Sequence, residues 1–107
     1  MIDLNIKYNV NPPSKTYDVN ELENKFFESL FSKINSEGFV LVRMSDGTIS
    51  VELNTYAVGK IKLQGKKHKM QILKSLYKHD MIEGSIDDFI EHQDEWVKYI
   101  RKYITKG

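Results

Sequence analysis

Apolar and polar residues alternate along the first ten positions of the chain, with apolar side chains at positions 2, 4, 6, 8 and 10. A period of two is typical of a half-buried β-strand. Pro12 and Pro13 follow after Asn11, and proline interrupts the backbone pairing of a strand. We therefore predict a strand over residues 2–10.

A helical period replaces this alternation over residues 19–36. Asp18 and Glu21 have the spacing of a capping box, and Tyr17 and Leu22 have that of a hydrophobic staple. Gly38 is suited to the position just past the helix end. The apolar stripe consists of Leu22, Phe26, Phe27, Leu30, Phe31 and Ile34. These signals predict a helix that ends before Gly38.

Three short strands are predicted next, over residues 39–44, 48–54 and 56–64. In the third strand Ile61 and Leu63 would face inward, while Lys60 and Lys62 would face outward. Gly59 indicates either a bulge or a close approach of another part of the chain.

The turn between the first two of these strands fixes their register. Asp46-Gly47 favours a two-residue hairpin turn, because glycine accepts the positive φ that such a turn requires. Met44 would then lie opposite Ile49. In that register the buried side chains of the strand are Val40, Val42 and Met44, and the residues on the opposite face are Phe39 and Leu41.

Two helices are predicted to close the chain. The first covers residues 67–78, on the spacing of Met70, Leu73, Leu76 and Tyr77. Residues 81–84 form a connector. The second helix begins at Ser85, whose spacing from Asp88 is that of a capping box, and its apolar residues extend to position 104.

The resulting order is β-α-β-β-β-α-α. We predict one domain over residues 1–107, of the α+β class. Its core would be an antiparallel sheet of three to four strands with the helices packed on one face.

The order helix, three strands, helix over residues 18–78 resembles that of double-stranded RNA-binding domains. Gly65-Lys66-Lys67-His68-Lys69 is similar to the junction before the second helix of that family. Met70 stands where the family has a further lysine, and Ile72 and Leu73 replace small residues. The resemblance is one of topology, and it transfers no function.

Composition excludes several kinds of chemistry. The chain has no cysteine, which rules out disulfides, thiolate metal sites and cysteine nucleophiles. The first residues lack the pattern of a signal peptide, and no apolar run approaches the ~20 residues needed to span a bilayer. We therefore expect a cytoplasmic protein that does not enter a membrane.

Charge is distributed unevenly although the net charge is only +1. Residues 53–79 contain seven lysines and no acidic residue, whereas residues 80–95 contain seven acidic residues and no lysine or arginine. The basic stretch is therefore the best candidate for a functional surface.

Six lysines form the predicted nucleic-acid-binding site. Three of them would lie at the start of the helix predicted over residues 67–78, where free N–H groups suit a phosphate and Gly65 allows close approach. The six are Lys60, Lys62, Lys66, Lys67, Lys69 and Lys74. The alternative interpretation is a solvated face whose lysines pair with the acidic stretch.

No catalytic residue, cofactor or metal is predicted. Asp88, His92 and Glu95 share one face of the last helix, but an exposed acidic face explains them more simply than a metal site. No catalytic or nucleotide-binding motif is present, so an enzyme is the least favoured class.

Two functions remain. The first is a nucleic-acid-binding accessory protein that contacts phosphates through the lysines. The alternative is a small protein-interaction module or homodimer without catalytic activity. Its contacts would be made by the acidic half of the last helix or by Phe39 and Leu41.

Overall fold

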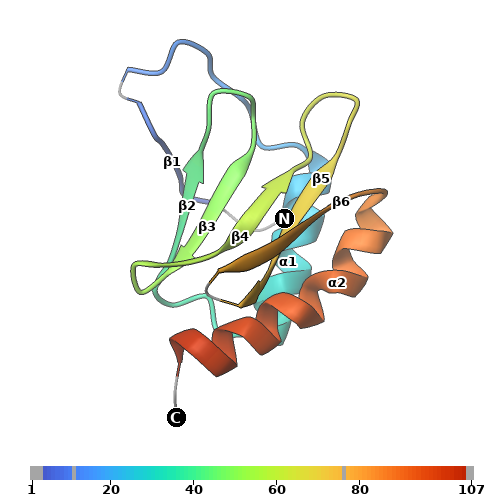
Figure 1. Cartoon of the computed structure of the whole chain (residues 1–107). Coiled ribbons are helices and arrows are strands. Elements are labelled where there is room, and N and C mark those ends of the chain that lie inside the picture. Colours follow the sequence, from blue (N-terminus) through green and yellow to red (C-terminus); the bar gives the residue numbers. More distant parts are fainter. Residues whose placement is uncertain (1–3, 11, 76, 106–107) are drawn as a thin grey trace.

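The computed structural model describes residues 4–10, 12–75 and 77–105. Figure 1 shows an α+β fold built on one six-stranded sheet, whose strands lie in chain order from β1 to β6. The short β1 (Ile6–Tyr8) runs parallel to β2 (Phe39–Arg43), and every other neighbouring pair is antiparallel. The prediction of an antiparallel sheet of three to four strands in the order β-α-β-β-β-α-α is therefore wrong.

Helix α1 (Glu21–Lys33) begins two residues later than predicted. Asn20 is its N-cap, because the Asn20 side chain accepts a hydrogen bond from the Glu23 N–H at 2.8 Å. The Glu23 carboxylate accepts one in return from the Asn20 N–H at 3.1 Å. The capping box is thus Asn20 with Glu23, not Asp18 with Glu21.

The hairpin between β2 and β3 (Ile49–Leu53) turns at Gly47, which has a φ of +92°. The Met44 N–H donates to the Thr48 carbonyl at 2.7 Å, so the loop contains three residues and not two. The register therefore shifts by one, and Arg43 lies opposite Ile49.

A one-residue shift exchanges the faces of a strand. Leu41 and Arg43 are buried beneath the helices, and Val40, Val42 and Met44 turn to the other face. The assignment of Val40, Val42 and Met44 to the core, with Phe39 and Leu41 opposite, is wrong. Phe39 packs against Phe31 of α1, with ring centroids 5.3 Å apart.

Strand β4 (Tyr56–Lys62) is followed by two strands where a helix and a connector were predicted. These are β5 (Lys69–Ser75) and β6 (Lys78–Glu83). Met70 and Ile72 are buried at a period of two, and Tyr77 is 93% exposed, so the helical stripe does not exist. Leu76 lies outside the described residues. The resemblance to double-stranded RNA-binding domains fails with this helix.

The last helix agrees with the prediction. Helix α2 (Ile86–Tyr99) is capped by Ser85 and Asp88, which form the expected capping box. It continues as one π-helical stretch, η1 (Ile100–Ile104), in which the Thr105 N–H donates to the Ile100 carbonyl at 2.8 Å.

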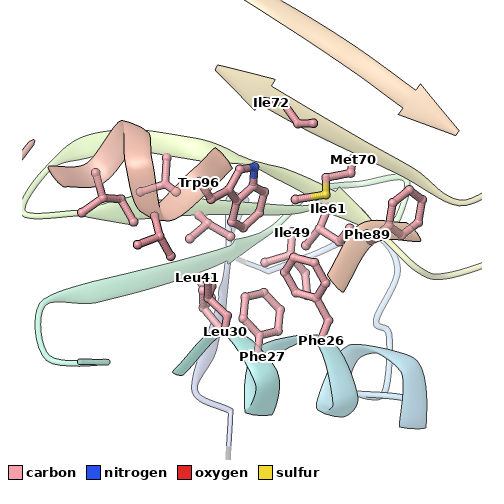
Figure 2. Close-up of a cluster of buried hydrophobic side chains, with 14 of the residues drawn as sticks. Phe26, Phe27, Leu30, Leu41, Ile49, Ile61, Met70, Ile72, Phe89 and Trp96 are labelled. Carbon is pink, nitrogen blue, oxygen red and sulfur yellow. The ribbon is translucent and has the colours of Figure 1, made fainter. Parts of the chain in front are cut away.

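Figure 2 shows how the two helices close the core on one face of the sheet. Phe26 of α1 meets Trp96 of α2 edge to face, with ring centroids 5.3 Å apart. Trp96 lies against Gly59, where an added Cβ would be 2.8 Å from the indole ring. Gly59 thus marks a close approach, one of the two expected alternatives, and the register of β3 and β4 also shifts beside it, between Val51 and Glu52. The buried strand residues labelled in the figure are Leu41, Ile49, Ile61, Met70 and Ile72. The opposite face of the sheet carries no helix among the described residues (Figure 1).

Candidate functional site

Three of the predicted lysines come together on the helix-free face of the sheet. Lys62 lies directly opposite Lys69 in the register of β4 and β5, and Lys60 lies one outward position further along β4. All three line a concavity of about 450 Å³, together with Met44 and Met81. The structure therefore assembles part of the expected site from two neighbouring strands.

Two further lysines lie in the adjoining loop between β4 and β5. Lys66 and Lys67 are exposed there, next to Gly65, whose φ is +75°. The His68 Nε2 donates to the Gly65 carbonyl at 3.0 Å and closes the loop. Because this segment is a hairpin, no helix start is available to bind phosphate. We call Lys60, Lys62, Lys66, Lys67 and Lys69 the lysine cluster.

Lys74 does not belong to the lysine cluster. Its ammonium lies on the helix side of the sheet, 2.9 Å from Glu95 of α2 and 3.9 Å from Asp80 of β6. The hydrogen bond to Glu95 raises the pKa of Lys74 and lowers that of Glu95. Lys74 thus has a structural partner and is not brought to the predicted site.

The lysine cluster is poorly neutralised. Lys62 lies 4.0 Å from Asp46, but the other four lysines form no ion pair within the described part of the chain. Burial acts to raise the pKa of Asp46, but hydrogen bonds from Thr48 and the charge of Lys62 hold it below its usual value. Two carboxylates, those of Asp46 and of Glu83, which lies opposite Lys69 on β6, therefore stand beside five ammonium groups.

The register of Lys62 and Lys69 is itself unfavourable for folding. Like charges directly opposite each other on neighbouring strands destabilise a sheet. An anion bound between the two side chains would remove this repulsion. The two side chains thus concentrate positive charge between neighbouring strands, next to Asp46 and Glu83.

Part of the acidic stretch forms contacts away from the lysine cluster. Asp87 pairs with Lys25 and Asp94 pairs with Lys33, each at 3.6 Å, and both lysines belong to α1. These contacts join the two helices on the covered face. Asp87 and Asp94 thus serve helix packing, whereas Glu83 of the same stretch lies opposite Lys69 in the register of β5 and β6 but forms no ion pair with it.

Two of the three residues considered as metal ligands have other partners, and the third, His92, lies 3.5 Å from Glu95. Asp88 accepts from the Ser85 N–H at 2.9 Å as part of the helix cap, and Glu95 binds Lys74. Within residues 4–10, 12–75 and 77–105, no group of three or more His, Asp or Glu is arranged to hold a metal ion.

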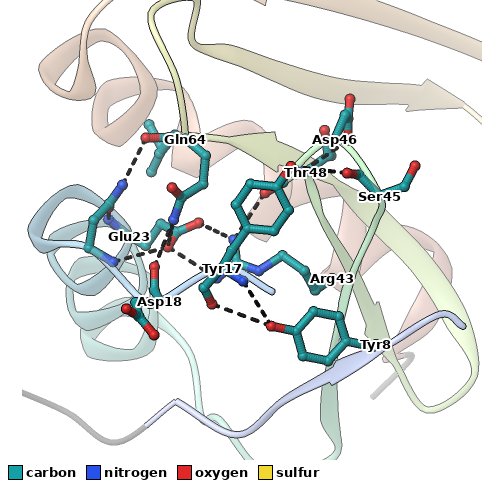
Figure 3. Close-up of polar contacts among 12 residues, drawn as sticks. Tyr8, Tyr17, Asp18, Glu23, Arg43, Ser45, Asp46, Thr48 and Gln64 are labelled. Atoms are coloured by element: carbon teal, nitrogen blue, oxygen red, sulfur yellow. Dashed lines mark hydrogen bonds and ion pairs between the residues drawn. The ribbon is translucent and has the colours of Figure 1, made fainter. Parts of the chain in front are cut away.

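A buried ion pair supports the end of the sheet that carries the lysine cluster (Figure 3). Glu23 of α1 and Arg43 of β2 form a bidentate pair, and both side chains are almost completely buried. Arg43 also donates to the Gly47 carbonyl at 3.0 Å, and Gln64 donates to Glu23 at 2.9 Å. The pair thereby connects α1 to the loops on either side of the concavity.

Tyr17 extends this network to the chain that precedes α1. Its hydroxyl donates to the Ser45 carbonyl at 3.0 Å, and its N–H donates to the Tyr8 hydroxyl at 3.0 Å. The Gln64 amide also donates to the Asp18 carbonyl at 2.8 Å. Sequence reasoning missed these contacts, and the available signal was Arg43, the one charged residue in an otherwise apolar strand.

A second basic region lies on the opposite side of the molecule. Lys98, Arg101 and Lys102 line a concavity of about 630 Å³ beside α2 and η1. Tyr99 and Tyr103 also line it, with ring centroids 4.8 Å apart. This region is a natural comparison for the lysine cluster, because it offers a similar charge in a different place.

No helix in the described residues is long and apolar enough to cross a membrane. Comparisons of the chain with protein-family models, curated proteins and solved structures found no significant match.

Proposed function

We propose that the lysine cluster binds the phosphate backbone of nucleic acid, and that the chain is a nucleic-acid-binding accessory protein. One observation carries the proposal. Five lysines gather at one end of the sheet, and four of them have no ion pair within the described residues. Two lysines stand opposite each other where an anion between them would relieve repulsion.

The chemistry of the cluster suits phosphate better than bases. Lysine presents a compact, hydrated charge that attracts phosphate oxygens but does not read the pattern of a base edge. Binding should therefore depend strongly on salt and weakly on sequence. The cytoplasmic location expected from the sequence belongs to the same proposal, and it is supported by the absence of cysteine.

The test is fluorescence anisotropy with labelled single- and double-stranded DNA and RNA over a series of salt concentrations. Each phosphate contact contributes about −0.7 to −0.9 to the slope of log K against log salt. We expect the double substitution Lys60→Gln, Lys69→Gln to reduce the magnitude of the slope by about 1.5 and to weaken binding at low salt. The double reversal Lys66→Glu, Lys67→Glu should abolish binding without unfolding the chain, since both side chains are exposed.

The matched control is the double substitution Lys98→Gln, Lys102→Gln, which removes the same charge from the second basic region. We expect this variant to keep the wild-type slope. An equal loss in both variants would mean that overall charge drives binding, and a loss only in the control would place binding at the second region. Either result overturns the assignment to the lysine cluster, and absence of binding at low salt overturns the function.

A further inference from the structure

Strand β6 is an open edge of the sheet. It pairs with β5 on one side, and β5 and β4 are the strands against which α2 packs. The first four residues of β6, 78–81, are exposed, and so is Glu83. An edge strand presents a row of unpaired backbone N–H and C=O groups. At the other edge β1 has only three residues, so β6 is the longer of the two available edges.

The register with β5 assigns the β6 side chains to the two faces of the sheet. Ile82 lies opposite the buried Met70 and packs against the core, and Asp80 reaches Lys74 on the same side. The alternate residues therefore face the helix-free side, where Met81 is 52% exposed. The side chains on that face are His79, Met81 and Glu83.

We propose that two copies of this chain associate through β6, in antiparallel register, with Met81 of each copy opposite Met81 of the other. A two-fold axis perpendicular to the sheet relates the copies, so their helix-free faces lie on the same side. Residues that face each other must then share a face of the sheet. This pairing places His79 of each copy opposite Glu83 of the other.

Charge decides between this register and its neighbour. A pairing centred on Asp80 would set two carboxylates face to face, which destabilises antiparallel strands. The pairing centred on Met81 instead joins two apolar side chains at the axis and gives two His–Glu contacts beside it. Complementary pairs of this kind each stabilise a sheet by a few tenths of a kcal/mol or more. Of these two registers, the one centred on Met81 thus makes the strand complementary to itself.

The edge carries charged residues, and its pairing with β5 is irregular only near its first residues, opposite Leu73 to Ser75. Among residues 78–83 there is no proline, and the charges are of both signs. Strand pairing alone makes a small interface, so we expect a reversible dimer with a dissociation constant in the micromolar range. Met81 also lines the concavity beside the lysine cluster, and Glu83 lies opposite Lys69, so the dimer has to be tested in the absence of nucleic acid.

Sedimentation velocity over a range of protein concentrations tests the dimer. Met81→Lys and Met81→Glu should each be monomeric, because each sets two like charges opposite each other at the axis. An equimolar mixture of the two variants should form a dimer again, since lysine then faces glutamate. The control substitutions Ser50→Lys and Ser50→Glu lie on the same face but on the inner strand β3, and they should remain dimeric.

Each other outcome contradicts the proposal. A wild-type chain that stays monomeric up to its solubility limit excludes the dimer. A dimer that persists in both Met81 variants uses another surface. If the Met81 variants are monomeric but their mixture is too, the register centred on Met81 is wrong. Circular dichroism of each variant separates these results from unfolding.

Discussion

The Arg43 side chain connects several segments at one end of the sheet. It lies in β2 facing the helices, where its guanidinium contacts Glu23, the Gly47 carbonyl and the ring of Tyr17. A buried charge is tolerated only when it is paired and its hydrogen bonds are satisfied. No buried side-chain nitrogen or oxygen among the described residues lacks a partner, so this condition is met.

Removal of both members of the buried pair should cost less than the sum of the two single removals. We expect Glu23→Gln and Arg43→Met each to lower the free energy of unfolding by about 3–5 kcal/mol, because a charge is left buried without its partner. The double variant should lose less than the sum by more than ~1 kcal/mol. Urea denaturation of the four proteins measures the coupling, and strictly additive losses would contradict it.

At the scale of the element, α1 shows which polar residue starts the helix. Asn20 is bound on both sides, since its side chain caps the Glu23 N–H and donates to the Leu63 carbonyl at 3.0 Å. Asp18, which the sequence favoured, offers only its backbone carbonyl, which accepts from Gln64. Contacts to the end of a distant strand thus decide which of the two nearby polar residues caps the helix.

This difference can be measured with two alanine variants. We expect Asn20→Ala to lower the free energy of unfolding by about 1–2 kcal/mol, because the helix loses its cap. Asp18→Ala should change it by less than ~0.5 kcal/mol, since its side chain is exposed. Thermal and urea unfolding of both variants provide the comparison. A larger loss from Asp18→Ala than from Asn20→Ala would refute the assignment.

At the scale of the whole molecule, three carboxylates link stability to pH. A hydrogen bond from Lys74 lowers the pKa of Glu95, and hydrogen bonds from Ser85 lower that of Asp88. Thr48 and Lys62 together lower the pKa of Asp46 in spite of burial. All three groups are held in the ionised form by contacts that exist only in the folded chain.

The sign of the effect follows from the direction of these shifts. A carboxyl group with a lowered pKa in the folded state stabilises the fold above its ordinary value and loses this contribution as the pH falls below it. The ordinary values are 3.8 for aspartate and 4.5 for glutamate. We therefore expect the urea midpoint to stay level above about pH 5 and to fall steadily below pH 4.5. Asp88→Asn should make that fall shallower, and a variant with the same pH dependence as the wild type would contradict this role.

The sequence alone determined the elements whose signals are local. The capping box of Ser85 and Asp88, the long final helix and the strands of the region 39–64 all rest on residues within a few positions of one another. These elements could therefore be predicted without knowledge of distant contacts. The inward position of Ile61 and the outward position of Lys60 and Lys62 also follow from a period of two along one strand.

Tertiary structure decided the type of element over residues 67–78 and the faces of β2, which the local pattern did not determine. Residues 67–78 fit a helical and a strand period equally well over so short a window, and pairing with β4 and β6 selected the strand. That choice turned a supposed helix start into a hairpin, so Lys60, Lys62 and Lys69 share a sheet face while Lys74 is bound on the other side. One extra residue in the loop at Gly47 reversed the faces of β2 and buried Arg43 beside Glu23. Loop length and strand partners act between residues far apart in the chain, and a periodic pattern contains no information about them.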